Sequence, residues 1–295
     1  MFWKLVKYEW NAMMRKMLPV YIAAAVIAVI NGFLWGNTEQ NLLARLPEWL
    51  FYLLQFAGML LYFSVLVCLC AVTFLFIAER FYKGLLKDEG YLMFTLPVRI
   101  WQLAVSKALV ALMTVFLSGI VGILAVCLLG IADPVSLLEI PREIAADVRE
   151  LFSEGNGVLV PGTGLHIFLI AAELLLLMLI SGFEMIYHFY FSMSLGQLNR
   201  THRVLWSVIW YIVISAVLSA ADWSLLMLLS GMLTISAETS EWIKNTLYSI
   251  AGSEAGISML AAEIVFLVLL VWKGIRLTVE VIPTHWILEH RLNLE

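Results

Sequence analysis

Ionisable and hydroxyl side chains recur at helical spacing inside one of the longest apolar stretches of the chain, residues 165–195. This stretch contains Glu173, Ser181, Glu184 and His188. Intervals of three, four and eleven residues return an α-helix nearly to the same face, so these side chains are predicted to form one polar stripe. Ionisable groups are costly inside a bilayer and are functional candidates for that reason. The stripe offers a polar surface inside apolar surroundings.

Two interpretations of this stripe are open. In the first, the stripe and Glu263 of a later apolar run line a translocation path or a seam between subunits. In the second, the same residues only hydrogen-bond one helix to another, with Glu173 and Glu263 protonated. Both interpretations require these side chains to face protein or water rather than lipid.

A second polar cluster separates two long apolar runs, in segment 80–97. Gly90 follows two carboxylates and is predicted to end a helix, because glycine enters the left-handed cap conformation without a steric penalty. Pro97 closes the segment, since the residue before a proline is disfavoured in a helix. The segment is therefore predicted to be a short cytoplasmic elbow that another protein grips. Its candidate residues are Arg80, Tyr82, Lys83, Lys87, Asp88, Glu89, Gly90, Tyr91, Phe94 and Pro97.

Motifs for catalysis and cofactor binding do not occur in the sequence. There is no GxxxxGK[ST] phosphate-binding loop and no HExxH zinc motif. The cysteines Cys68, Cys70 and Cys127 lie inside apolar runs and form no CxxC pair, so they are assigned to packing. We therefore expect no enzyme: the chain has no predicted catalytic residue, no metal site and no cofactor of its own.

The elements that position these residues are predicted to be membrane-spanning helices. The chain has 295 residues, 62% of them hydrophobic and 14% charged. An apolar run of about 18 residues or more is long enough to span a bilayer as a helix. The predicted fold is an all-α polytopic membrane domain over residues 17–272. Its six predicted spans are residues 17–36, 49–78, 101–131, 165–195, 204–234 and 254–272.

The distribution of basic residues predicts the orientation of these spans. Lys and Arg concentrate in cytoplasmic segments of membrane proteins. Fourteen of the eighteen basic residues fall before the first span, at the junction of spans two and three (where Lys107 lies in the first turns of span three), between spans four and five, or after span six. Both termini are therefore predicted to be cytoplasmic, in a plasma membrane. The net charge of −4 comes mostly from the predicted outer segments 132–164 and 235–253, so it does not indicate nucleic-acid binding.

The two ends of the chain are predicted to lie outside the spans. In residues 1–16, Trp3, Val6, Trp10 and Met13 recur at helical spacing opposite a stripe of basic residues. This pattern predicts an amphipathic helix lying flat in the membrane interface. Residues 273–295 are predicted to be a cytoplasmic tail.

The elbow also carries a resemblance to a known family. The sequence RFYKGLLKDEGYLMFTLPV, with QLAVSK shortly after it, resembles the permease subunits of bacterial type-2 ABC exporters of the small six-span kind found in Gram-positive bacteria. The opening WKLVKYEWNAMMRK and the closing WILEHRLNLE are similar to the same group. Where that family has a Ser-Arg or Thr-Arg pair after the proline, this chain has Val98-Arg99-Ile100.

The resemblance implies a function and a set of partners. It implies a non-enzymatic permease that works with two cytoplasmic ATPase subunits, which bind ATP and Mg, and with a second permease copy. It places an interfacial helix at 1–16 and an ATPase-coupling helix at about 80–97. The cargo would be a peptide, a lipid or an amphipathic drug-like molecule. The alternative is an immunity or sensor protein that binds an antimicrobial peptide with little transport.

Overall fold

The computed structural model describes residues 2–35, 47–86, 98–130, 142, 163–199, 201–233 and 254–290. These residues form long α-helices that divide into two compact units, Met1–Asp147 and Val148–Glu295. The prediction of an all-α fold is confirmed for the described part of the chain. The predicted outer segments fall almost entirely outside it.

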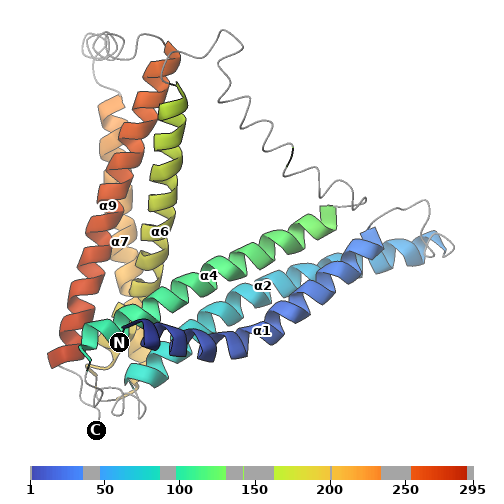
Figure 1. Ribbon diagram of the computed structural model, residues 1–295, viewed down its shortest axis with the longest axis horizontal. Coiled ribbons are helices and arrows are strands. Elements are labelled where there is room, and N and C mark those ends of the chain that lie inside the picture. Colours follow the sequence, from blue (N-terminus) through green and yellow to red (C-terminus); the bar gives the residue numbers. More distant parts are fainter. Residues whose placement is uncertain are drawn as a thin grey trace. The chain divides into compact units, whose positions relative to one another are not determined.

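The described part of the first unit is a bundle of three long helices: α1 (Phe2–Trp35), α2 (Glu48–Leu86) and α4 (Ile100–Gly130), which lie against one another (Figure 1). Small side chains allow α1 and α4 to approach closely. Where alanines face the neighbouring helix, no large side chain keeps the two backbones apart. Ala24, Ala28, Ala104, Ala108 and Ala111 are all buried. Small residues thus contribute to the packing of this bundle, in which larger side chains such as Met17 and Phe81 are also buried.

The expectation of a separate amphipathic helix over residues 1–16 is corrected. Residues 2–35 form a single helix, and this helix is apolar rather than clearly amphipathic. Val6, Met13 and Met17 do share a face, but they are buried against the protein instead of facing the membrane interface. Pro19 lies inside the helix and does not end it. A proline is tolerated in a membrane helix where neighbouring groups satisfy the freed backbone carbonyl.

The second unit contains α6 (Thr163–Gly196), α7 (Arg203–Leu233) and α9 (Glu254–His290). Helix α6 packs against both α7 and α9 (Figure 1). Ile186, Tyr187 and Tyr190 of α6 are buried, as are Ile287 and Leu288 of α9. Helix α9 does not stop at Trp272 but runs on to residue 290, so most of the predicted tail belongs to the same helix as the predicted sixth span.

Five stretches of the described chain are long and apolar enough to cross a membrane: Phe2–Gly32, Glu48–Leu86, Ile100–Ala125, Phe168–Gly196 and Arg203–Leu228. The predicted sixth span, in α9, is not among them. Large apolar side chains such as Phe63, Leu75 and Val217 are about two-thirds exposed on the helix surfaces. A water-soluble protein rarely exposes so much contiguous apolar surface. The chain is an integral membrane protein built from helical spans.

Candidate functional site

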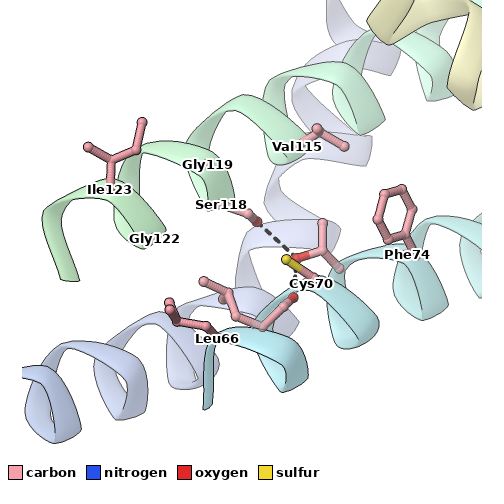
Figure 2. A pocket seen from close by; sticks show the side chains of 10 residues that line it. Leu66, Cys70, Phe74, Val115, Ser118, Gly119, Gly122 and Ile123 are labelled. Atoms are coloured by element: carbon pink, nitrogen blue, oxygen red, sulfur yellow. Dashed lines mark hydrogen bonds between the residues drawn. The ribbon is translucent and has the colours of Figure 1, made fainter. Parts of the chain in front are cut away.

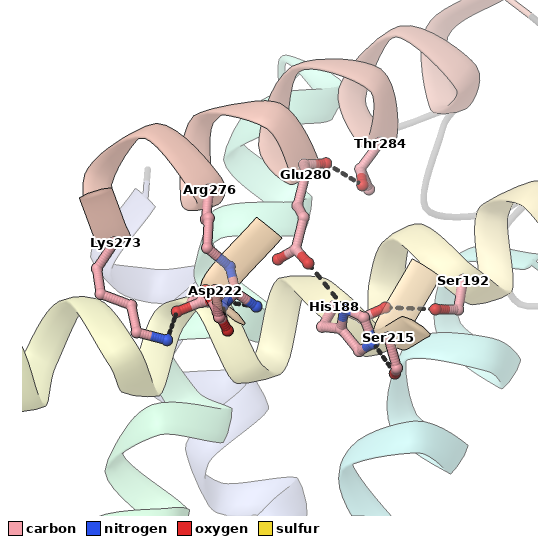
Figure 3. A network of polar contacts seen from close by, with 9 residues as sticks. His188, Ser192, Ser215, Asp222, Lys273, Arg276, Glu280 and Thr284 are labelled. Carbon is pink, nitrogen blue, oxygen red and sulfur yellow. Dashed lines mark hydrogen bonds and ion pairs between the residues drawn. The ribbon is translucent and has the colours of Figure 1, made fainter. Parts of the chain in front are cut away.

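A polar cavity of about 260 Å³ opens among the helices of the second unit. It is unusual for a membrane bundle because ionisable and hydroxyl side chains make up most of its wall. The residues that line it are Ser181, Glu184, Met185 and His188 of α6, Tyr211, Ser215 and Ser219 of α7, and Lys273 and Arg276 of α9. Figure 3 shows the charged and hydroxyl groups around this cavity and the contacts between them.

Ion pairs across three helices balance the charges beside the cavity. Glu184 accepts hydrogen bonds from Lys273 Nζ at 2.8 Å and from Arg276 Nη2 at 2.7 Å. Arg276 also binds Asp222 of α7, whose other carboxylate oxygen accepts a hydrogen bond from Trp272 Nε1 at 2.8 Å. The carboxylate of Glu184 is almost completely buried, with 6% of its side chain exposed. A buried carboxylate needs such partners, since an unpaired charge away from water costs several kcal/mol.

His188 joins the same three helices through both ring nitrogens (Figure 3). Its Nδ1 lies 2.7 Å from Glu280 Oε1 on α9, and its Nε2 lies 2.8 Å from Ser215 Oγ on α7. The ring of Tyr211 packs edge-on against the imidazole with centroids 4.8 Å apart. Glu280 is fully buried. The imidazole is therefore fixed in position and orientation.

The structure brings together part of the predicted polar stripe. Ser181, Glu184 and His188 all line the cavity. Glu173 does not, and its Oε2 is buried with no hydrogen-bond partner among the described residues. Glu263 does not line the cavity either; its Oε1 lies 2.8 Å from His166 Nδ1. The stripe thus makes interhelical hydrogen bonds and also borders a cavity, so the two interpretations of it are compatible.

Several residues in and beside the cavity are not among the candidates that the sequence indicates. The sequence pattern places Lys273 and Arg276 in the tail and Asp222 near the outer surface, and it gives Ser215 and Glu280 no role. A signal for the α9 residues exists, because Lys273, Arg276 and Glu280 are spaced by three and four residues and so share a helix face. Ser215 has a comparable signal, since Tyr211, Ser215 and Ser219 are spaced by four residues and so share a face of α7.

The predicted elbow is described only where it joins α2. Residues 87–97, with Lys87, Asp88, Glu89, Gly90, Tyr91, Phe94 and Pro97, lie outside the described residues. Arg80, Tyr82 and Lys83 belong to the last turns of α2. Lys83 pairs with Glu79 at 2.7 Å near the surface.

Arg80 takes part in a buried ion-pair cluster at the same end of the first unit. Its Nε donates to Glu9 Oε2 at 2.7 Å, and Lys107 Nζ donates to Glu9 Oε1 at 2.6 Å. The side chains of Glu9 and Lys107 are 4% and 2% exposed. Glu9, Arg80 and Lys107 belong to α1, α2 and α4 in turn. We call these residues the ionic node; a single carboxylate joins α1, α2 and α4, the long helices that the structure describes in this unit.

An apolar groove of about 510 Å³ lies between α2 and α4 in the first unit (Figure 2). The groove is lined by the apolar side chains of Leu66, Phe74, Val115 and Ile123. On the α4 side it is also lined by Gly119 and Gly122, which have no side chain to fill it. At its base the Ser118 hydroxyl lies 2.9 Å from Thr73 Oγ1. It also lies 2.8 Å from the hydroxyl of Tyr21 on α1, so the polar atoms at the groove floor bond to one another.

Comparison with known proteins adds no family. No protein-family model matches the chain, and no curated protein or solved structure matches it either. The class that fold and site define is a polytopic helical membrane protein with a charged, hydroxyl-lined cavity inside one unit.

Proposed function

We propose that the chain is the permease subunit of a bacterial type-2 ABC exporter. It would move a peptide, a lipid or an amphipathic drug-like cargo across the plasma membrane. The resemblance of residues 80–107 to such permeases is one support. The observation that carries the proposal is the ionic node, because Glu9 binds both Arg80 and Lys107 directly beside the elbow.

A coupling element must transmit a displacement to more than one helix, and the node provides that connection. Helix α2 is continuous up to Leu86, so its last turns form the first part of the elbow. Phe81 and Leu85 are fully buried in this last part of the helix. Close-packed side chains have low compressibility and pass strain on to their neighbours. Movement of the elbow would thus reach α1 and α4 as well as α2.

The rest of the assembly is a consequence of this function. Two cytoplasmic ABC ATPase subunits would bind ATP and Mg and would grip the elbows of two permease copies. This chain would hold no cofactor, carry out no catalysis in transport and bind no nucleic acid. Both termini would be cytoplasmic. Closure of the ATPases would shift the spans between inward- and outward-facing states, and the polar cavity lined by Glu184 and His188 offers a surface for polar parts of a cargo.

The test is charge reversal at the elbow, Asp88→Lys together with Glu89→Lys. Loss of a charge from a closed interface leaves its partner buried and unpaired, which costs several kcal/mol, whereas the loss of an exposed charge costs little. The double variant should insert normally but lose co-purification with a P-loop ATPase and lose cargo-stimulated ATP hydrolysis. Glu289→Lys, at an exposed position near the end of α9, is the control and should retain both.

Two results would contradict the proposal. One is a double variant that binds the ATPase and transports like the parent. The other is a parent chain that never co-purifies with a P-loop protein from native membranes, which would favour the immunity or sensor function instead.

A further inference from the structure

A serine, a histidine and a glutamate form a continuous hydrogen-bonded chain in the second unit (Figure 3). Ser215 Oγ lies 2.8 Å from His188 Nε2, and His188 Nδ1 lies 2.7 Å from Glu280 Oε1. The three residues come from α7, α6 and α9, respectively. A hydroxyl on one ring nitrogen and a carboxylate on the other is the arrangement that activates a serine as a nucleophile.

The three hydrogen-bonded residues differ in how far they are buried. The side chain of Glu280 is 1% exposed and that of His188 is 12% exposed. Glu280 does not line the cavity, whereas His188 and Ser215 do. The carboxylate is thus the protected end, and Ser215 and His188 are the members that border the cavity. A hydrogen bond that served only to hold helices together would not require its partners to border a cavity.

We propose that Ser215 is the nucleophile and His188 the general base of an acyl-transfer site that hydrolyses small carboxylic esters. Glu280 is a positioning residue: it holds the imidazole and stabilises its protonated form. This activity goes beyond transport and does not depend on an ATPase partner.

The reaction balances with water as the only co-reactant. Ser215 Oγ forms a bond to the ester carbonyl carbon while its proton passes to His188 Nε2. The tetrahedral intermediate collapses, the bond to the alkoxy group breaks, and His188 returns the proton to the departing alcohol. Water then attacks the acyl-serine, again giving its proton to His188, and the carboxylic acid is released with Ser215 restored.

The cavity limits the substrate by size and charge. A volume of about 260 Å³ admits an ester group with a few carbons but not a whole lipid. Ser215 lies near the middle of the candidate span Arg203–Leu228, so a neutral substrate reaches it at a lower cost than an ion. Lys273 and Arg276, both paired with Glu184, line the same cavity, and cationic groups of this kind stabilise a developing oxyanion.

The experiment uses the purified full-length chain in nanodiscs without an ATPase. A fluorophosphonate probe should label Ser215, identified by mass spectrometry of the modified peptide, and p-nitrophenyl butyrate should be hydrolysed. Ser215→Ala removes a single oxygen atom, and we expect both the labelling and the hydrolysis to fall at least about a hundredfold. Ser224→Ala is the matched control, because Ser224 is on the same helix but bonds to the backbone oxygen of Ala221. It should behave like the parent.

Glu280→Gln tests the positioning role separately. The amide oxygen can still accept a hydrogen bond from the imidazole, but it no longer stabilises the imidazolium, so the midpoint of the pH–rate profile should move to lower pH. A purely structural role would leave that midpoint in place. The proposal is overturned if Ser215 is not labelled, if hydrolysis survives in Ser215→Ala, or if Glu280→Gln leaves the midpoint unchanged.

Discussion

At the scale of single residues, two buried carboxylates of the described chain, Glu9 and Glu184, lie in groups that compensate their charge. Glu9 faces two cations, and Glu184 faces two cations, one of which also reaches Asp222. Removing one member of a buried pair is far more costly than removing an exposed one, because the remaining charge keeps its desolvation penalty. The carboxylates at the centre of these groups should therefore be the most sensitive positions.

Glu9→Gln tests this expectation. Lys107 would lose the carboxylate at 2.6 Å while its ammonium group stays almost completely buried. We expect a loss of about 3–5 kcal/mol in the free energy of unfolding, typical of a broken buried pair. Unfolding in detergent by denaturant titration measures it. Glu79→Gln is the control, because Glu79 binds Lys16 and Lys83 at the surface and such pairs contribute about 0–1 kcal/mol. If Glu9→Gln and Glu79→Gln lost the same free energy of unfolding, the buried pair would be no more important than the surface pair.

The sequence predicts part of the candidate site because helical spacing is a local property. Ser181, Glu184 and His188 can be placed on one face from their intervals alone. Their partners cannot be found in that way. Whether Glu184 meets Lys273, or His188 meets Ser215, depends on the register between helices, and that register is set by packing contacts far apart in the sequence.

At the scale of helices, length and apolar composition predict where most helices lie. Charged residues, however, are a poor guide to where a helix ends. The predicted sixth span ends at Trp272 because Lys273 and Arg276 come next, yet α9 continues to residue 290. Carboxylates on neighbouring helices neutralise those cations, so the helix can keep them inside the bundle. The prediction of a flat helix at 1–16 fails for a related reason: Val6 and Met13 of its apolar stripe are buried by the protein itself, although Trp3 stays exposed.

Gly84 shows how one glycine leaves room for a buried ammonium group. A Cβ at this position of α2 would lie 2.6 Å from Lys107 Nζ of α4, which is itself held by Glu9. Gly84→Ala should therefore displace the ammonium group and cost about 1–3 kcal/mol, as overpacked sites do. Lys107→Ala by itself breaks the buried pair with Glu9 and is costly, but in that background Gly84→Ala should add little further loss, since the clash disappears.

Gly122→Ala is the comparison for this effect. An added Cβ there meets nothing within 4 Å, so the higher helix propensity of alanine should stabilise the protein by up to about 1 kcal/mol. Thermal unfolding of both single variants and the double variant in one detergent gives the comparison. A Gly84→Ala variant as stable as Gly122→Ala would show that Lys107 has room to move.

At the scale of the whole molecule, the basic residues that predict orientation in the membrane also form ion pairs inside the helix bundles. Arg80, Lys107, Lys273 and Arg276 contribute to the predicted cytoplasmic excess, and all four bind carboxylates inside a bundle. The remaining basic residues still favour both termini inside. A reporter fused after Glu295 should be active only in the cytoplasm, and one inserted at Gly155 only outside. Activity of the Gly155 fusion in the cytoplasm would reverse the proposed orientation.

The number of permease copies in the assembled complex is a further test of the proposed function. One chain supplies one elbow, whereas a motor of two ATPases needs two, so a closed complex should contain two permeases related by a twofold axis. Large apolar side chains exposed on α2 and α7, such as Phe63 and Val217, leave helix faces that either lipid or a second copy can cover. Native mass spectrometry of the complex extracted in mild detergent should report two copies of this 33.3 kDa chain together with two P-loop subunits. A tagged and an untagged copy expressed together should co-purify. An active complex that contains a single copy and no second permease would exclude this arrangement.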